Sequence, residues 1–275
     1  MSTTTATDSA TDTRPAPTRP QQRTAPAPIP FTRILGVEFQ KMFDTRAGLW
    51  LMASVVIVSL LTTAGVIVFA DAEDLTYETF GTAVGIPMSV VLPIIAILAV
   101  TSEWSQRTAL TTFTLVPSRG RVIAAKLVDI LVIGLAGMGI AMGAGAVGNV
   151  VGTAIAGEDP VWNLETQVFG QLLLAMIITM LVGFALAALF RSTPAAIVGY
   201  FVWGMVLPGI SGALAGVNQW WFDNAAWFEL NTAMFPLYDQ VPTGEQWAQL
   251  GVTTLIWVVL PCLVGTRLLL RSEVK

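Results

Sequence analysis

Residues 102–126, SEWSQRTALTTFTLVPSRGRVIAAK, form a polar stretch between two long apolar segments. The stretch carries Glu103, Arg107, Arg119, Arg121 and Lys126 in a chain of which only 12% of residues are charged. It is too polar to cross a membrane and too long to be a simple hairpin turn. Its charge leaves two interpretations open, a solvated loop that orients the neighbouring segments or a docking surface for a partner protein.

The composition of the whole chain is that of a membrane protein. Of its 275 residues, 54% are hydrophobic, and the charged share is roughly half of the quarter that is usual in soluble domains. There is no histidine, which excludes histidine-dependent catalysis and disfavours zinc binding. Cys262 is the single cysteine and cannot form a disulfide within the chain. We therefore expect an all-α polytopic membrane protein with one integrated domain.

Six apolar runs are close to the ~20 residues that a helix needs to cross the hydrocarbon core. The predicted spans are about 49–70, 85–101, 127–155, 169–190, 195–215 and 248–270. Pro87 and Pro93 interrupt the second span. Pro208 and Pro261 are expected to bend the fifth and sixth, where neighbouring helices can satisfy the freed carbonyls.

All 14 basic residues fall on one side of these spans. They are Arg14, Arg19, Arg23, Arg33, Lys41, Arg46, Arg107, Arg119, Arg121, Lys126, Arg191, Arg267, Arg271 and Lys275. The loops on the other side carry acids only, from Asp71–Glu78, Glu158–Glu165 and Asp223–Glu245. Because positive loops stay in the cytoplasm, we expect both termini to be cytoplasmic.

Two different segments precede the first span. Residues 1–30 are rich in Thr, Ala and Pro, which predicts a disordered cytoplasmic tail. Residues 31–46 carry apolar side chains at helical spacing and predict an amphipathic helix that lies on the bilayer surface. Glu38 falls on its apolar face, so it either pairs with Lys41 or reaches towards water.

The third span has a face of small residues and one acid. Its small residues are Gly134, Ala141, Gly145, Gly148 and Gly152, with GxxxG frames at Gly139/Gly143 and Gly148/Gly152. Small residues let helices approach closely in lipid; packing within the chain is favoured here over a subunit interface. Asp129 lies one turn from Lys126, which favours a local ion pair over a proton-binding site.

The segment 216–247 is long and aromatic, and includes Trp220, Trp221 and Trp227. Tryptophan prefers the membrane–water interface. The segment is therefore either a belt of anchors or a set of short re-entrant helices around an exit vestibule.

Several motifs that carry chemistry do not occur. The sequence has no GxxxxGK[ST] phosphate loop, no HExxH and no GxSxG. The ionisable residues at mid-bilayer that a proton-coupled carrier would use are also missing. We expect a chain that is not an enzyme, with no catalytic residues, no metal site and no cofactor of its own.

The chain resembles the permease subunits of bacterial ABC-2 type ABC transporters over residues 31–275. The resemblance rests on VEFQKMFDTR before the first span, on the six-span pattern, and on EWSQRT, VPSRGR and AAK in the polar stretch. Residues Glu103, Thr108, Pro117, Arg119 and Lys126 match the E-x-x-x-G-T, P-x-x-R and K pattern of such loops. Arg107 departs from it, because glycine is usual there.

The resemblance implies one half of an ATP-driven exporter in the bacterial cytoplasmic (inner) membrane. Two permease chains, identical or homologous, would work with ABC ATP-binding subunits that hold ATP and Mg²⁺, among membrane lipids and without nucleic acid. The substrate would be hydrophobic or amphipathic: a drug, a lipid or a peptide. A passive channel, an anchoring or assembly protein and an ion-coupled secondary carrier are the alternatives.

The same resemblance implies a coupling surface made by the amphipathic helix and by a coupling helix between the second and third spans. The residues assigned to coupling are Glu38, Lys41, Glu103, Arg107, Thr108, Pro117, Arg119, Arg121 and Lys126.

Overall fold

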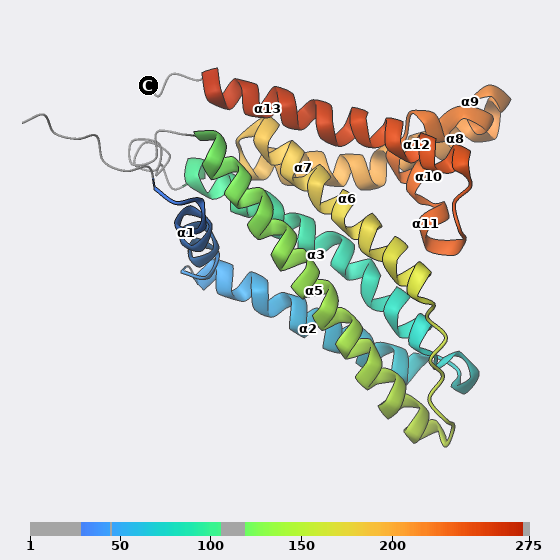
Figure 1. Ribbon diagram of the computed structural model, residues 1–275. Helices are drawn as coiled ribbons and strands as arrows, with labels where there is room; N and C mark the ends of the chain where they lie inside the picture. Colours follow the sequence, from blue (N-terminus) through green and yellow to red (C-terminus); the bar gives the residue numbers. More distant parts are fainter. Residues whose placement is uncertain (1–28, 45, 106–118, 272–275) are drawn as a thin grey trace, which may run out of the picture.

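The computed structural model describes residues 29–44, 46–105 and 119–271. The elements in these ranges are helices, with one isolated bridge between Thr76 and Val161. The long helices are α1 (Phe31–Phe43), α2 (Arg46–Phe69), α3 (Tyr77–Ser105), α5 (Arg119–Ala156) and α6 (Thr166–Phe190) (Figure 1). The rest are η1 (Ala72–Asp74), α7 (Thr193–Phe201), η2 (Val202–Val206), α8 (Leu207–Val217), α9 (Gln219–Asn224), η3 (Ala225–Trp227), α10 (Leu230–Met234), α11 (Pro236–Asp239), α12 (Gly244–Thr254), η4 (Leu255–Val259) and α13 (Leu260–Arg271).

Within the described residues, six helical segments are long and apolar enough to cross a membrane, as the sequence predicts. They are Gly48–Phe69, Tyr77–Ser102, Gly120–Ala156, Thr166–Phe190, Thr193–Val217 and Gly244–Leu268. The chain is a helical membrane protein by this criterion. Of the predicted disordered tail, residues 1–30, residues 1–28 lie outside the described ranges.

The second and third spans are longer than expected. The third helix, α5, begins at Arg119, inside the predicted polar loop. Basic residues oppose the dipole in a first helical turn, so charge does not explain this start. Val122 and Ala125 are buried in a cluster with Ile34 of α1, and this packing holds the first turns of α5 in place.

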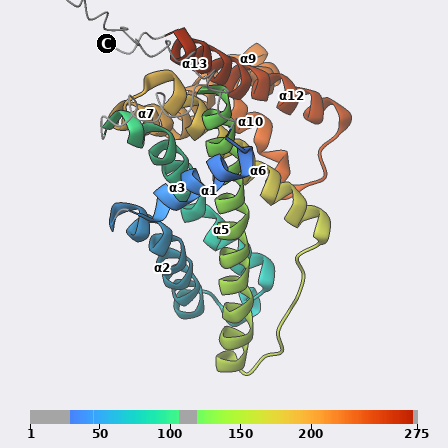
Figure 2. The ribbon, with the colours of Figure 1, turned by 60° about the vertical axis from the view of Figure 1, so that its left-hand side comes forward.

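Helix α3 lies at the centre of the bundle, beside α2, α5, α6 and α7 (Figures 1 and 2). Its side chains Phe80, Met88 and Leu92 are fully buried, as are Ile130 of α5 and Met180 of α6. The apolar residues of α3 therefore face protein rather than lipid around much of the helix. This explains why the second span tolerates two prolines without ending.

The small-residue face of α5 packs within the chain over most of its length. A Cβ added at Gly148 would lie 2.4 Å from Thr63 Cγ2 and 2.8 Å from the Phe80 ring, and one at Gly134 would lie 2.3 Å from Met180 Sδ. Gly139 and Gly143 instead have nothing within 4 Å. The expectation of internal packing is confirmed for the Gly148/Gly152 frame and not for the Gly139/Gly143 frame.

The fifth and sixth spans each contain a π-helical segment, η2 and η4, that is followed by Leu and then Pro. In the π pattern the carbonyl of residue i accepts from residue i+5. For Trp203 that residue is Pro208, which has no N–H to donate. The Asn231 side-chain amide, from α10, donates to the Trp203 carbonyl at 3.2 Å in its place.

The two ends of the bundle differ in charge. We call one the basic end; it holds α1, the last turns of α3, the first turns of α5 and the α6–α7 turn at Arg191. We call the other the acidic end; it holds η1 and the α5–α6 connection, with Asp71, Glu73, Glu158 and Asp159. In Figure 1 the basic end lies to the left and the acidic end to the right.

Candidate functional site

The amphipathic segment folds as α1 and packs on α5 through two residues that lie one helical turn apart. Ile34 and Glu38 are its buried residues, 5% and 3% exposed, and they lie four positions apart on one face. Ile34 packs against Val122 and Ala125. Phe31, Val37 and Phe39 remain exposed at different positions around the helix. The segment therefore binds α5 through the face that carries Ile34 and Glu38, and leaves other apolar side chains at its surface.

A buried ion pair lies beside this apolar contact. The Nζ atom of Lys126, in α5, is 2.6 Å from Glu38 Oε2, and the Lys41 ammonium donates to Glu38 Oε1 at 2.6 Å. The side chains of Glu38 and Lys126 are 3% and 7% exposed, whereas that of Lys41 is 40% exposed. Lys126 also donates to the carbonyl of Ala99 in α3 at 3.1 Å. One ammonium group thus connects α1, α5 and α3, and we call Glu38, Lys126 and the Ala99 carbonyl the basic-end joint.

Two opposing effects set the ionisation of Glu38. Burial alone would raise the pKa of this carboxyl, but the nearby Lys126 and Lys41 ammonium groups outweigh burial and hold the pKa below its ordinary value of 4.5. The Glu38 carboxyl is therefore ionised at neutral pH. Removing one partner of such a pair leaves a buried charge without compensation, which costs about 3–5 kcal/mol.

Asp129 lies one turn beyond Lys126 on α5 and is 2% exposed. Its Oδ2 atom is buried and has no hydrogen-bond partner. The Lys126 ammonium pairs with Glu38 of another helix, and the ion pair expected between Lys126 and Asp129 stays a prediction. The alternative in which Glu38 reaches towards water is wrong, since its carboxylate is 3% exposed and lies between Lys126 and Lys41.

A second polar contact at the basic end joins α3 to α7. The hydroxyl groups of Thr101 and Thr193 are 2.8 Å apart, and Thr101 also donates to the carbonyl of Ile97. The last turns of α3 are thus bonded to α5 through Ala99 and to α7 through Thr101. Sequence reasoning missed both threonines, because a lone threonine in an apolar run is no signal of a contact between helices.

The predicted coupling residues fall into three groups in the structure. Glu38, Lys41 and Lys126 come together in and beside the basic-end joint. Glu103 lies in the last turn of α3, while Arg119 and Arg121 lie in the first turn of α5 rather than in a loop. Arg107, Thr108 and Pro117, with the expected coupling helix itself, lie outside the described residues.

The aromatic segment folds into short helices at the acidic end. The rings of Trp221 and Phe228 stack at a centroid distance of 6.0 Å, and Trp220 lies 6.4 Å and 6.1 Å from them. The Trp221 indole also donates to the Ser211 carbonyl and hydroxyl. Trp227 lies half-buried in η3 and belongs to no such ring pair among the described residues. Glu229 is buried and caps α10 through bonds from Asn231 and Thr232.

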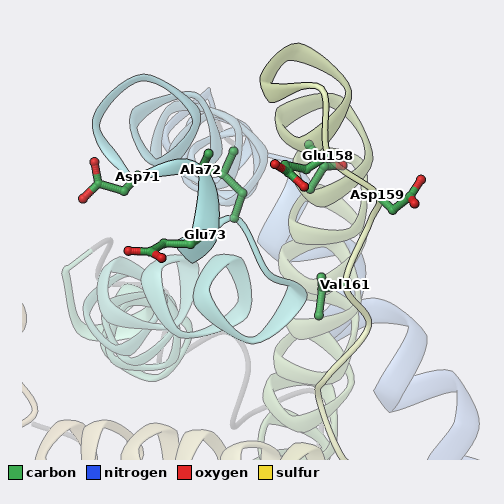
Figure 3. A pocket seen from close by; sticks show the side chains of 8 residues that line it. Asp71, Ala72, Glu73, Glu158, Asp159 and Val161 are labelled. Carbon is green, nitrogen blue, oxygen red and sulfur yellow. The ribbon is translucent and has the colours of Figure 1, made fainter.

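A shallow pocket at the acidic end lies between η1 and the end of α5. Asp71, Glu73, Glu158 and Asp159 line it, but the carboxylates of Asp71 and Glu73 point to one side of the view and that of Asp159 points to the other (Figure 3). Over the described ranges no group of three or more His, Cys, Asp or Glu side chains could hold a metal ion. The pocket is therefore an acidic surface feature, and the basic-end joint is the best-built polar site of the described chain.

Comparison with known proteins returns no match, neither to a family model nor to a curated protein.

Proposed function

We propose that this chain is the transmembrane permease subunit of an ATP-driven exporter and that a separate ATPase subunit docks at the basic end. The observation that supports this most is the basic-end joint. A buried ion pair fixes α1 to α5, and the same ammonium holds the end of α3. A force applied to α1 would therefore be transmitted to two membrane-crossing helices.

The position of the polar stretch adds to this proposal. Its two ends are helical and continuous with α3 and α5, so no flexible linker lies between the described ends and their spans. A partner that moves Glu103 or Arg119 would move the basic-end turns of both helices. Such a partner would be an ABC ATP-binding subunit that supplies ATP and Mg²⁺, and the functional unit would contain a second permease chain, identical or homologous.

The proposal includes a location and an orientation. The chain would reside in a bacterial cytoplasmic membrane with both termini and Arg191 inside, because every basic residue lies on one side. α1 would lie at the interface, where the exposed Phe31 and Phe39 side chains would contact lipid. The substrate would be hydrophobic or amphipathic.

The test is purification of the intact chain from native membranes in detergent or nanodiscs, followed by identification of bound subunits and an ATPase assay. We expect a Walker-motif ATPase to co-purify and the chain alone to hydrolyse no ATP. ATP turnover by the isolated chain, or ATP-independent transport that needs an ion gradient, would contradict the proposal. If the chain is purified without any bound ATPase, a passive channel or an assembly protein would be favoured.

A further inference from the structure

Pro93 breaks the hydrogen-bond ladder of α3 at one carbonyl. The helix runs through Pro93 without ending, but a proline has no N–H for the carbonyl four residues earlier. That carbonyl belongs to Ser89. The hydroxyl of Tyr200, from α7, donates to it. A side chain from another helix therefore replaces the bond that the proline removes.

Two neighbouring helices close on α3 at this position. Tyr200 is 5% exposed, and its ring lies 5.6 Å from that of Trp203, so its side chain is fixed by packing. From the α6 side, a Cβ added at Gly183 would lie 2.9 Å from the Pro93 carbonyl oxygen and 3.3 Å from its Cα. The backbone of α6 thus approaches α3 closely at Pro93.

The break separates two parts of α3 that have different partners. Towards the acidic end, the Glu78 N–H and carboxylate bond the Asn163 side chain, and the Tyr77 N–H donates to the Val161 carbonyl. Towards the basic end, Ala99 accepts from Lys126, and Thr101 contacts Thr193. The first part is thus bonded to the α5–α6 connection, and the second to the basic-end joint and α7.

We propose that Pro93 is a pivot in α3 and that the Tyr200 hydroxyl is the latch that holds the pivot in the present conformation. Release of the latch lets residues 93–105 move with the basic-end joint while residues 77–92 stay bound to the α5–α6 connection. Only the source of the force, an ATPase at the basic end, rests on the proposed function.

The first test is a double-mutant cycle on the purified chain without any partner. Tyr200→Phe keeps the ring and removes the hydroxyl; we expect a fall in melting temperature of about 2–4 °C, the shift for one hydrogen bond in a chain of this size. Pro93→Ala restores an N–H to the Ser89 carbonyl, so in that background Tyr200→Phe should have little effect. Pro87→Ala is the control, and its cycle with Tyr200→Phe should be additive. If the melting-temperature changes of Pro93→Ala and Tyr200→Phe simply add, the proposed role of the Tyr200 hydroxyl as a latch is wrong.

The second test measures the motion itself. The hydroxyls of Thr101 and Thr193 are 2.8 Å apart, so the pair Thr101→Cys and Thr193→Cys can be cross-linked in a Cys262→Ser background. We expect Tyr200→Phe to slow this cross-linking at least fivefold and Pro93→Ala to restore the rate. The pair Glu78→Cys and Asn163→Cys, in the other part of α3, should react at an unchanged rate.

An unchanged Thr101–Thr193 rate in Tyr200→Phe would overturn the pivot, as would equal slowing of both pairs. Neither measurement involves ATP or a partner. Failure of the proposed function, shown by a chain that recovers no ATPase, is therefore distinguishable from failure of the pivot.

Discussion

The basic and acidic ends of the bundle are held together by different chemistry. At the basic end, α1, α5 and α3 meet at the buried Lys126 ammonium, through Glu38 and the Ala99 carbonyl. At the acidic end, the connections that flank α3 and α5 are joined mainly through main-chain carbonyls and the amides of Asn149 and Asn163. The acids of η1 and of the α5–α6 connection, Asp71, Glu73, Glu158 and Asp159, lie on the surface.

The difference matters because buried charges and neutral amides respond unequally to change. An ionic joint is strong only while both partners are present, whereas each neutral hydrogen bond contributes only about 1 kcal/mol. Loss of either charged partner is therefore expected to disrupt the contacts among α1, α3 and α5 together. The acidic end is a sum of small contacts. A region that transmits force between helices needs a strong contact such as the buried ionic joint of the basic end.

The largest expected effect is at Glu38. Replacement by glutamine leaves the Lys126 ammonium buried beside a neutral amide, and we expect the free energy of unfolding to fall by about 3 kcal/mol or more. Chemical unfolding in detergent measures this. Because the pKa of Glu38 is lowered in the folded state, its contribution is present above pH 4.5 and is lost as the pH falls below that value. Glu38→Gln should therefore remove part of the acid sensitivity.

The matched control is Glu78→Gln at the acidic end, where the carboxylate is exposed and bonds only an amide. We expect a change within about 0.5 kcal/mol. A second control removes both charges at the joint through Glu38→Met and Lys126→Met, which should recover most of the lost stability. Equal effects of the two glutamine variants would remove the contrast between the ends.

The next effect in size concerns packing towards the acidic end. Gly148→Ala places a methyl group against Thr63 and Phe80, and we expect destabilisation by about 1–3 kcal/mol. Gly143→Ala, one helix turn and a residue away, meets nothing within 4 Å and should be neutral or stabilising. Thermal unfolding of the two variants checks this. Destabilisation by Gly143→Ala would instead point to an occupied surface on that face of α5.

The smallest effect is expected at Asp129. Its Oδ2 atom has no hydrogen-bond partner in a buried position beside the ionic joint. Asp129→Asn removes a carboxylate from the neighbourhood of Glu38, so we expect the free energy of unfolding to rise by about 1 kcal/mol. Chemical unfolding at neutral pH decides the sign. A loss of stability would show that Asp129 is a required partner in the joint.

The six spans and the basic and acidic ends could be read from the sequence because they depend on composition over long windows. Hydropathy locates each apolar span, and the separation of basic from acidic loops shows which loops lie on the same side of the spans. The start of α5 could not be read in this way. Arg119 and Arg121 look like loop residues, and only contact between Val122, Ala125 and α1 explains why the helix extends through them.

Half of the basic-end joint could be predicted from the sequence. An acid on the apolar face of a helix is a signal of a buried partner, and Glu38 is such an acid in α1. Its partner Lys126 lies 88 positions away in the chain. Spacing along the sequence instead predicts a pair between Lys126 and Asp129, which are neighbours on the same helix. Spacing within one helix is visible in a sequence, whereas the contact between α1 and α5 depends on how the helices pack.

The proposed ATPase docking at the basic end is tested most directly by partner recovery from membranes. Glu103→Ala and Arg119→Ala change charges in the helical turns that flank the polar stretch, and Glu78→Ala and Glu158→Ala are matched changes at the acidic end. Loss of one partner of a desolvated interfacial charge pair costs about 2–5 kcal/mol. We therefore predict that both basic-end variants lose at least tenfold in recovery of a Walker-motif ATPase and in its stimulated ATP hydrolysis, with expression and membrane insertion unchanged, while the acidic-end variants stay within twofold. Equal recovery and equal stimulation in all four variants would contradict the account.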